Sequence, residues 1–178
     1  GTLNKNKNTM TLERKISKLF NLTHDNWMKH SNSWSVWTRY SVLPLIVFAF
    51  WSRLWIGWWC IIPGGISLLW MFFNPIFFKE PISTKNWASR AVMGERVYLN
   101  RDIVPIPTIH KGPILNILNG ISSIGMGLAI WSIVYYSLWG AFTGTLLAYL
   151  GKSWFLDRMV WLYEDMKDAN SEYKSWDF

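Results

Sequence analysis

The sequence predicts an all-α membrane protein in which four transmembrane helices form two hairpins, with interfacial amphipathic helices on the cytoplasmic side. Residues 40–78 contain one charged residue, Arg53, and residues 114–150 contain none. Each stretch is about twice as long as the roughly 20 residues that one crossing needs. The chain also has 14 Trp, a residue that prefers the membrane–water interface. Together these observations predict two membrane hairpins.

Residues 1–36 form the predicted N-terminal cytoplasmic tail and interfacial helix. Apolar residues between positions 10 and 21 recur at helical spacing, which places them on one face: Leu12, Ile16, Leu19 and Phe20. Basic residues lie mostly off that face. A helix of this kind rests either on a membrane surface that contains anionic lipid or on the cytoplasmic side of the protein itself. The sequence leaves both alternatives open.

Residues 37–78 form the predicted first hairpin, with crossings over about 37–52 and 58–78 and a turn near 52–57. The second crossing contains Pro63-Gly64-Gly65, which predicts a kink or an unwound turn. A single long helix through Arg53 that breaks at Pro63 is the alternative. It is less favoured because it buries a guanidinium in lipid, at a cost of about 3 kcal/mol.

The remaining elements repeat this plan. Residues 79–112 form a predicted cytoplasmic loop with a helix over about 85–101, capped by Ser83 or Thr84. Residues 113–155 form the second hairpin, with crossings over about 114–136 and 139–155. Residues 156–178 form a C-terminal cytoplasmic helix and a loose tail. The predicted contact between the third and fourth crossings uses small or hydrogen-bonding residues at roughly one-turn spacing, namely Asn116, Asn119, Ser123, Gly127, Gly140, Gly144 and Ala148.

Charge predicts the orientation. Seven Lys or Arg precede residue 40, six lie in residues 79–112 and four follow residue 151, whereas the hairpin tips carry Arg53 alone. Positive residues stay in the cytoplasm, so both termini and the middle loop are expected there. The same rule accounts for the net charge of +7 without a nucleic-acid partner. The expected interface anchors are Trp34, Trp37, Trp58, Trp59, Trp131 and Trp139.

Several segments together resemble a known family. They are HSNSWSVWTR at 30–39, NWASRAVMGER at 86–96, DRMVWLYEDM at 157–166, Trp51-Ser52-Arg53 and Ile56-Gly57-Trp58-Trp59. Over residues 26–167 the chain is similar to a family of small prokaryotic integral membrane proteins known only as a domain of unknown function. In that family proline often follows the Asn that matches Asn32, whereas Ser33 stands here. The resemblance implies a prokaryotic cytoplasmic membrane and transfers no activity, cofactor or site.

Candidate chemical groups lie on the expected cytoplasmic side. Glu95, Asp157 and Glu164 are candidate catalytic residues, and His30 and His110 are candidate metal ligands. The histidines lack a metal-binding spacing and no nucleophile motif is recognisable, so we expect no cofactor. Ion pathways need ionisable residues within the membrane, and Arg53 alone lies within the two apolar stretches.

The leading prediction for function is therefore a non-catalytic accessory or structural subunit of a larger integral membrane complex, such as a membrane-bound monooxygenase or respiratory enzyme. Its partners are the lipid bilayer and other integral membrane proteins. A membrane enzyme or ligand-binding protein with a cytoplasmic-interface site is the first alternative, and a small transporter is the second.

Overall fold

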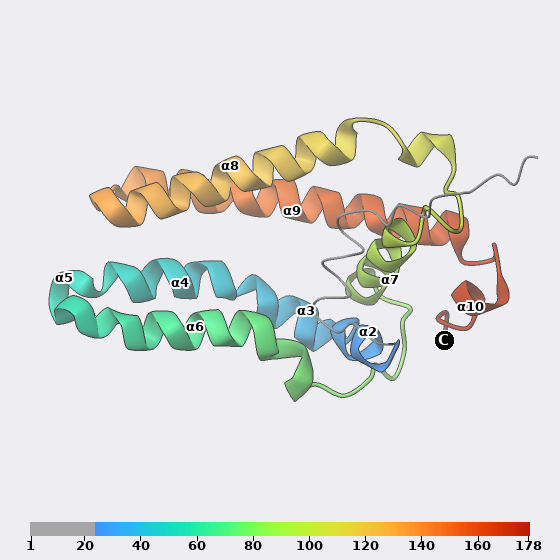
Figure 1. The fold of residues 1–178 in the computed structure, drawn as a ribbon, viewed down its shortest axis with the longest axis horizontal. Coiled ribbons are helices and arrows are strands. Elements are labelled where there is room, and N and C mark those ends of the chain that lie inside the picture. Colours follow the sequence, from blue (N-terminus) through green and yellow to red (C-terminus); the bar gives the residue numbers. More distant parts are fainter. Residues whose placement is uncertain (1–23) are drawn as a thin grey trace, which may run out of the picture.

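The computed structural model describes residues 24–178, so the predicted interfacial helix over 10–21 lies outside the described residues. The prediction of an all-helical fold is confirmed for the described part, which contains no strand. Figure 1 shows the elements, with η for 3₁₀ helices: α2 His24–His30, α3 Ser33–Tyr40, α4 Val42–Trp51, α5 Arg53–Ile56, η1 Gly57–Cys60, α6 Ile61–Phe73, η2 Asn74–Phe77, α7 Trp87–Leu99, η3 Thr108–His110, α8 Ile114–Tyr135, α9 Leu138–Met166 and α10 Ser171–Lys174.

Two hairpins extend in the same direction from a cluster of shorter helices. α4 and α6 form the first hairpin, with α5 at its tip, and α8 and α9 form the second. Both tips lie at the same end of the molecule, on the left in Figure 1. At the opposite end lie α2, α3, α7, α10 and the last turns of α9, which we call the base.

The apolar side chains of the hairpins face mainly outward. Phe48 on α4, Ile66 on α6, Ile124 on α8 and Phe142 on α9 are 72%, 62%, 66% and 66% exposed. Among the described residues, two helical stretches are long and apolar enough to cross a membrane, Ser33–Phe77 and Thr108–Tyr135.

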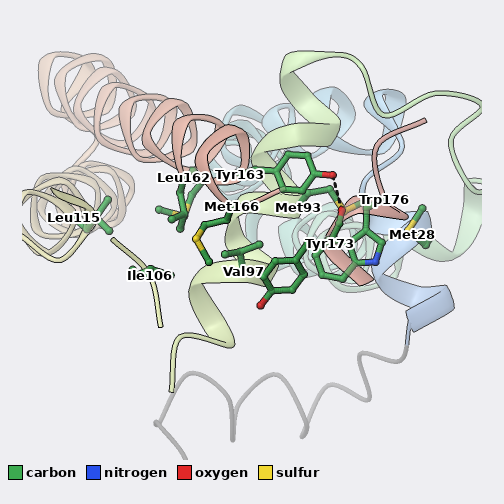
Figure 2. Packing of buried hydrophobic residues seen from close by; sticks show 11 residues of the cluster. Met28, Met93, Val97, Ile106, Leu115, Leu162, Tyr163, Met166, Tyr173 and Trp176 are labelled. Atoms are coloured by element: carbon green, nitrogen blue, oxygen red, sulfur yellow. Dashed lines mark hydrogen bonds between the residues drawn. The ribbon is translucent and has the colours of Figure 1, made fainter. Parts of the chain in front are cut away.

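The largest buried core lies in the base. It joins α7 to the end of α9 and to the C-terminal segment, with contributions from Met28 and Leu115 (Figure 2). Tyr163, Tyr173 and Trp176 are its large aromatic members, and the Tyr163 hydroxyl donates to the Tyr173 carbonyl oxygen at 3.1 Å. The chain therefore buries apolar groups where its sequence is most polar and exposes them where its sequence is most apolar.

α6 continues through Pro63-Gly64-Gly65, where the sequence predicts a kink or an unwound turn. Pro63 is the third residue of α6, and the helix continues to Phe73. A proline in the first turn has no intrahelical hydrogen bond to lose, so the expected kink at Pro63-Gly64-Gly65 is wrong. The turn itself depends on Gly57, whose φ of 57° lies in the left-handed region that glycine adopts without strain.

The second hairpin packs through glycine, but only one of its two predicted faces is buried. Gly140, Gly144 and Ala148 of α9 are buried against α8. A Cβ on Gly144 would lie 2.5 Å from the Ala129 nitrogen, so only glycine permits this approach. The α8 face predicted to meet them is wrong, because its four residues are exposed: Asn116, Asn119, Ser123 and Gly127. The buried α8 residues include Leu118, Gly125, Ala129 and Ser132.

The second helix of this hairpin does not end near Phe155. α9 continues unbroken to Met166, so its last turns belong to the base. The expected boundary between the hairpin at 113–155 and the tail at 156–178 is therefore not a break in the structure. A rise of about 1.5 Å per residue allows one helix to serve both parts.

The C-terminal tail is ordered by the segment before α7, contrary to the prediction that it is loose. The Thr84 amide and the Ser83 hydroxyl donate to the Phe178 carbonyl oxygen at 2.7 and 2.8 Å. Because these groups hold the tail, the cap of α7 is supplied instead by Asn86, whose side chain accepts from the Ser89 amide at 2.8 Å. The predicted cap at Ser83 or Thr84 is wrong.

Polar contacts join the two hairpins at both ends. At the tips, Arg53 donates to the carbonyl oxygens of Ile133 and Val134 at 2.6 and 2.8 Å, in the last turn of α8. Near the base, the Tyr40 and Tyr149 rings stack with centroids 5.5 Å apart, and the Tyr149 hydroxyl donates to the Tyr40 carbonyl oxygen. Arg53 thus provides donors and positive charge where the end of α8 presents free carbonyls.

Candidate functional site

The outer part of the base is held by a network of ion pairs. Arg90 of α7 pairs with Glu164 of α9 and, at 3.1 Å, with Asp177 of the C-terminal segment. Lys167 bridges the same two carboxylates, at 3.1 Å to Glu164 and 3.8 Å to Asp177. Two cations and two carboxylates therefore satisfy one another, and this network fixes the tail to α7 and α9.

Asp157 takes part in a separate contact. Its carboxylate accepts from the Trp87 indole nitrogen at 2.9 Å, and the Trp87 ring stacks on Trp37 with centroids 5.7 Å apart. Arg158 lies beside it in sequence but stacks over Trp161 instead, 5.0 Å from the ring centroid. These contacts link α9 to α7 and α3, which suits a structural role for Asp157.

Glu95 faces a small polar cavity between α7, α8 and α9. The cavity measures about 210 Å³, and its lining includes Asn119, Ser122 and Lys152. Burial raises the pKa of Glu95, while the positive charges of Lys152 and Arg39 oppose that rise. Along α9, Lys152 precedes Glu164 by twelve residues, or about 18 Å. The candidate carboxylates Glu95, Asp157 and Glu164 therefore have separate surroundings.

Arg39, whose charge acts on Glu95, and the neighbouring His30 have incomplete hydrogen bonding among the described residues. One Arg39 nitrogen, Nη2, donates to the His30 carbonyl oxygen at 3.1 Å. Arg39 Nη1 and His30 Nδ1 are also buried, and neither has a hydrogen-bond partner among residues 24–178. Burial, with Arg39 and Lys152 nearby, lowers the pKa of His30 to about 3. The imidazole is therefore neutral at pH 7.

The two candidate metal ligands belong to different clusters. His110 is buried against Trp161 and pairs with Asp165, with 2.6 Å between Nε2 and Oδ2. His30 lies with Arg39 and Lys152. In the part of the chain from 24 to 178, no group of three or more His, Cys, Asp or Glu side chains is placed to hold a metal ion.

Sequence reasoning missed the residues that surround Glu95. Lys152 stands alone at the end of an apolar run, and Arg39 stands in a segment rich in Trp and Ser, so each resembles an ordinary anchor near an interface. One local signal points to the site. Glu95 follows Gly94, at which a Cβ would lie 1.8 Å from the Met159 carbonyl oxygen, so α7 and α9 approach closely there. All six expected Trp anchors are exposed: Trp34, Trp37, Trp58, Trp59, Trp131 and Trp139.

These features define an all-helical protein with two apolar hairpins on a polar base. The chain belongs to the DUF6653 family, described as a family of unknown function, whose model matches residues 11–176. No curated protein and no solved structure matches the chain. The matched region includes both hairpins, the cavity at Glu95 and, apart from Asp177, the ion-pair network around Arg90.

Proposed function

We propose that the protein is a non-catalytic accessory or structural subunit of a larger integral membrane complex in the prokaryotic cytoplasmic membrane. In this proposal the two hairpins provide four crossings, and the base and both termini lie in the cytoplasm. The distribution of Lys and Arg supports this orientation, because Arg53 alone lies at the far tips.

One observation carries the functional part of the proposal. Apolar side chains on all four helices of the two hairpins face outward. In the base, two of the candidate carboxylates are already engaged, Glu164 by Arg90 and Asp157 by Trp87. An exposed apolar surface of this extent suits lipid and the helices of other membrane proteins. Acidic groups that already have partners are poorly placed to act on a substrate.

Mild-detergent extraction from the native membrane tests this proposal. We expect a tagged chain to migrate on a native gel in an assembly with another integral membrane protein at a fixed ratio, identified by mass spectrometry. An unrelated tagged four-helix membrane protein of similar size is the control and should not recover that partner. Migration as a single 20.9 kDa chain plus micelle, with no co-purifying protein, would refute the accessory-subunit proposal.

The cavity at Glu95 favours a second candidate, a ligand-binding role at the cytoplasmic interface. Glu95 and Lys152 present a carboxylate and an ammonium to one cavity, which Asn119 and Ser122 complete with hydrogen-bonding groups. That lining matches a small zwitterion such as an amino acid. Equilibrium dialysis with a pool of labelled amino acids tests it. Binding that Glu95→Gln abolishes and Glu80→Gln preserves is expected, and equal retention by both variants would contradict it.

A further inference from the structure

A second and larger hollow lies between α2 and the end of the first hairpin. It has a volume of about 710 Å³. One wall carries Asn26, Lys29 and His30 of α2, and the other carries Phe72 and Phe73 of α6 and Ile76 of η2. We call it the α2–η2 groove. Its polar and apolar walls face each other, which is the arrangement that an amphipathic ligand requires.

The apolar wall continues the outward surface of the first hairpin. Phe72 and Ile76 are 55% and 65% exposed. They lie where α6 gives way to η2 and the chain turns toward the base (Figure 1). A hydrocarbon chain that lies along α6 could therefore enter the groove without leaving apolar surroundings.

The polar wall has positive charge from Lys29, which lies between Asn26 and His30. Among the described residues, Lys29 has no ion-pair partner and no carboxylate lines the groove. The Lys29 ammonium suits a phosphate, with which it forms charge-assisted hydrogen bonds.

We propose that the α2–η2 groove binds an anionic glycerophospholipid, with its phosphate at Lys29 and an acyl chain along Phe72 and Ile76. This inference rests on the membrane location proposed above and adds a specific lipid site to it. A volume of about 710 Å³ falls within the range of ligand pockets, about 300–1,000 Å³, and suits a headgroup with the upper part of its chains. Basic pockets on the cytoplasmic side of a membrane bind such headgroups.

Native mass spectrometry of the full chain tests the proposal. Detergent-purified protein is titrated with phosphatidylglycerol or with phosphatidylcholine of the same chain length. We expect the first bound phosphatidylglycerol to be retained more strongly than phosphatidylcholine. Lys29→Gln should weaken that binding about fivefold, which corresponds to the roughly 1 kcal/mol that one basic residue contributes at an anionic membrane surface. Lys85→Gln changes the same charge at an exposed site outside the groove and should leave binding unchanged.

A second variant tests the apolar wall. Ile76→Asn should weaken both lipids, because it places an amide where the acyl chain lies. Equal binding of the two lipids by the native chain would overturn the proposal, as would equal losses from Lys29→Gln and Lys85→Gln. Alkaline carbonate extraction separates this result from a failure of the membrane location. A chain that remains in the membrane pellet but shows no lipid preference refutes the groove alone, whereas a chain released by carbonate refutes the location as well.

Discussion

The His30 imidazole is neutral at neutral pH because burial and two nearby cations oppose its protonation. Its pKa falls from 6.5 to about 3, so folding favours the form without the proton. A depressed histidine pKa adds stability above pH 6.5, and this stability is lost as the pH falls from 6.5 toward 3. A shift of this size sets an upper limit of about 5 kcal/mol on the loss, at about 1.4 kcal/mol per pKa unit.

We expect His30→Phe to reduce the pH dependence of unfolding between pH 6.5 and pH 3. Thermal unfolding of lipid-free protein in detergent, followed by tryptophan fluorescence, measures it. The difference between variant and native chain removes the contribution of carboxylates that protonate in the same range. His24→Gln, at an exposed position of the same helix, is the control. Parallel pH profiles for the native chain and His30→Phe would contradict the buried neutral imidazole.

Arg53 provides a second test at the scale of one residue. Its guanidinium donates to the Ile133 and Val134 carbonyl oxygens and lies over the Tyr136 ring at 4.5 Å. Arg53→Gln should lower the free energy of unfolding by about 1–3 kcal/mol, because two carbonyls at the end of α8 lose a charged donor. Trp58→Phe, at an exposed position of the same tip, should have little effect. Equal unfolding midpoints for the two variants would show that the guanidinium does not hold the tips together.

At the scale of helices, α8 and α9 approach through positions that lack a side chain. A Cβ on Gly144 would lie 2.5 Å from the Ala129 nitrogen and 2.8 Å from the Gly125 carbonyl oxygen, and a backbone cannot move aside as a flexible side chain can. Gly144→Ala should therefore cost about 1–3 kcal/mol by overpacking.

Gly127→Ala is the matched control on α8. A Cβ there meets nothing within 4 Å, and alanine favours helix over glycine by up to about 1 kcal/mol, so this variant should be neutral or slightly stabilising. Unfolding in detergent by guanidinium or heat compares the two. Similar losses from both substitutions would restore the α8 face that the sequence predicts.

The sequence predicts some helix ends well because local chemistry determines them. Pro113 precedes a run without charge, and the predicted span 114–136 differs from α8 by one residue. The sequence predicts the wrong face of α8. Asn116 and Asn119 are predicted to turn inward for hydrogen bonds, yet Asn119 lines the cavity at Glu95. The close contact with α9 is made instead at Gly125 and Ala129.

Other features depend on contacts between distant residues. Thr84 bonds the Phe178 carbonyl, and Glu95 shares a cavity with Lys152. No periodicity within a single segment encodes either contact. The candidate carboxylates could be identified from the sequence, but which of them is engaged by a neighbour and which faces a cavity could not.

For the whole molecule, the distribution of buried groups is the informative property. Tyr163, Tyr173 and Trp176 are buried in the base, next to its ion pairs, while the hairpins expose Phe48 and Phe142. Water would favour the opposite arrangement, because exposed apolar area costs roughly 25 cal/mol per Å². In the proposed membrane location, hydrocarbon around the hairpins and water around the base stabilise this distribution.

Cysteine accessibility tests most directly the central claim that both tips lie on one side of a membrane and the base on the other. Single cysteines replace Trp58, Trp139, Lys85 or Lys174 in a Cys60→Ala chain, because Cys60 is the only native cysteine. A membrane-impermeant maleimide is then applied to intact spheroplasts and to permeabilised ones. We expect positions 58 and 139 to react in intact spheroplasts, and positions 85 and 174 to react only after permeabilisation. Reaction of 58 and 139 on opposite sides, or of all four positions on the same side, would contradict the two-hairpin membrane protein.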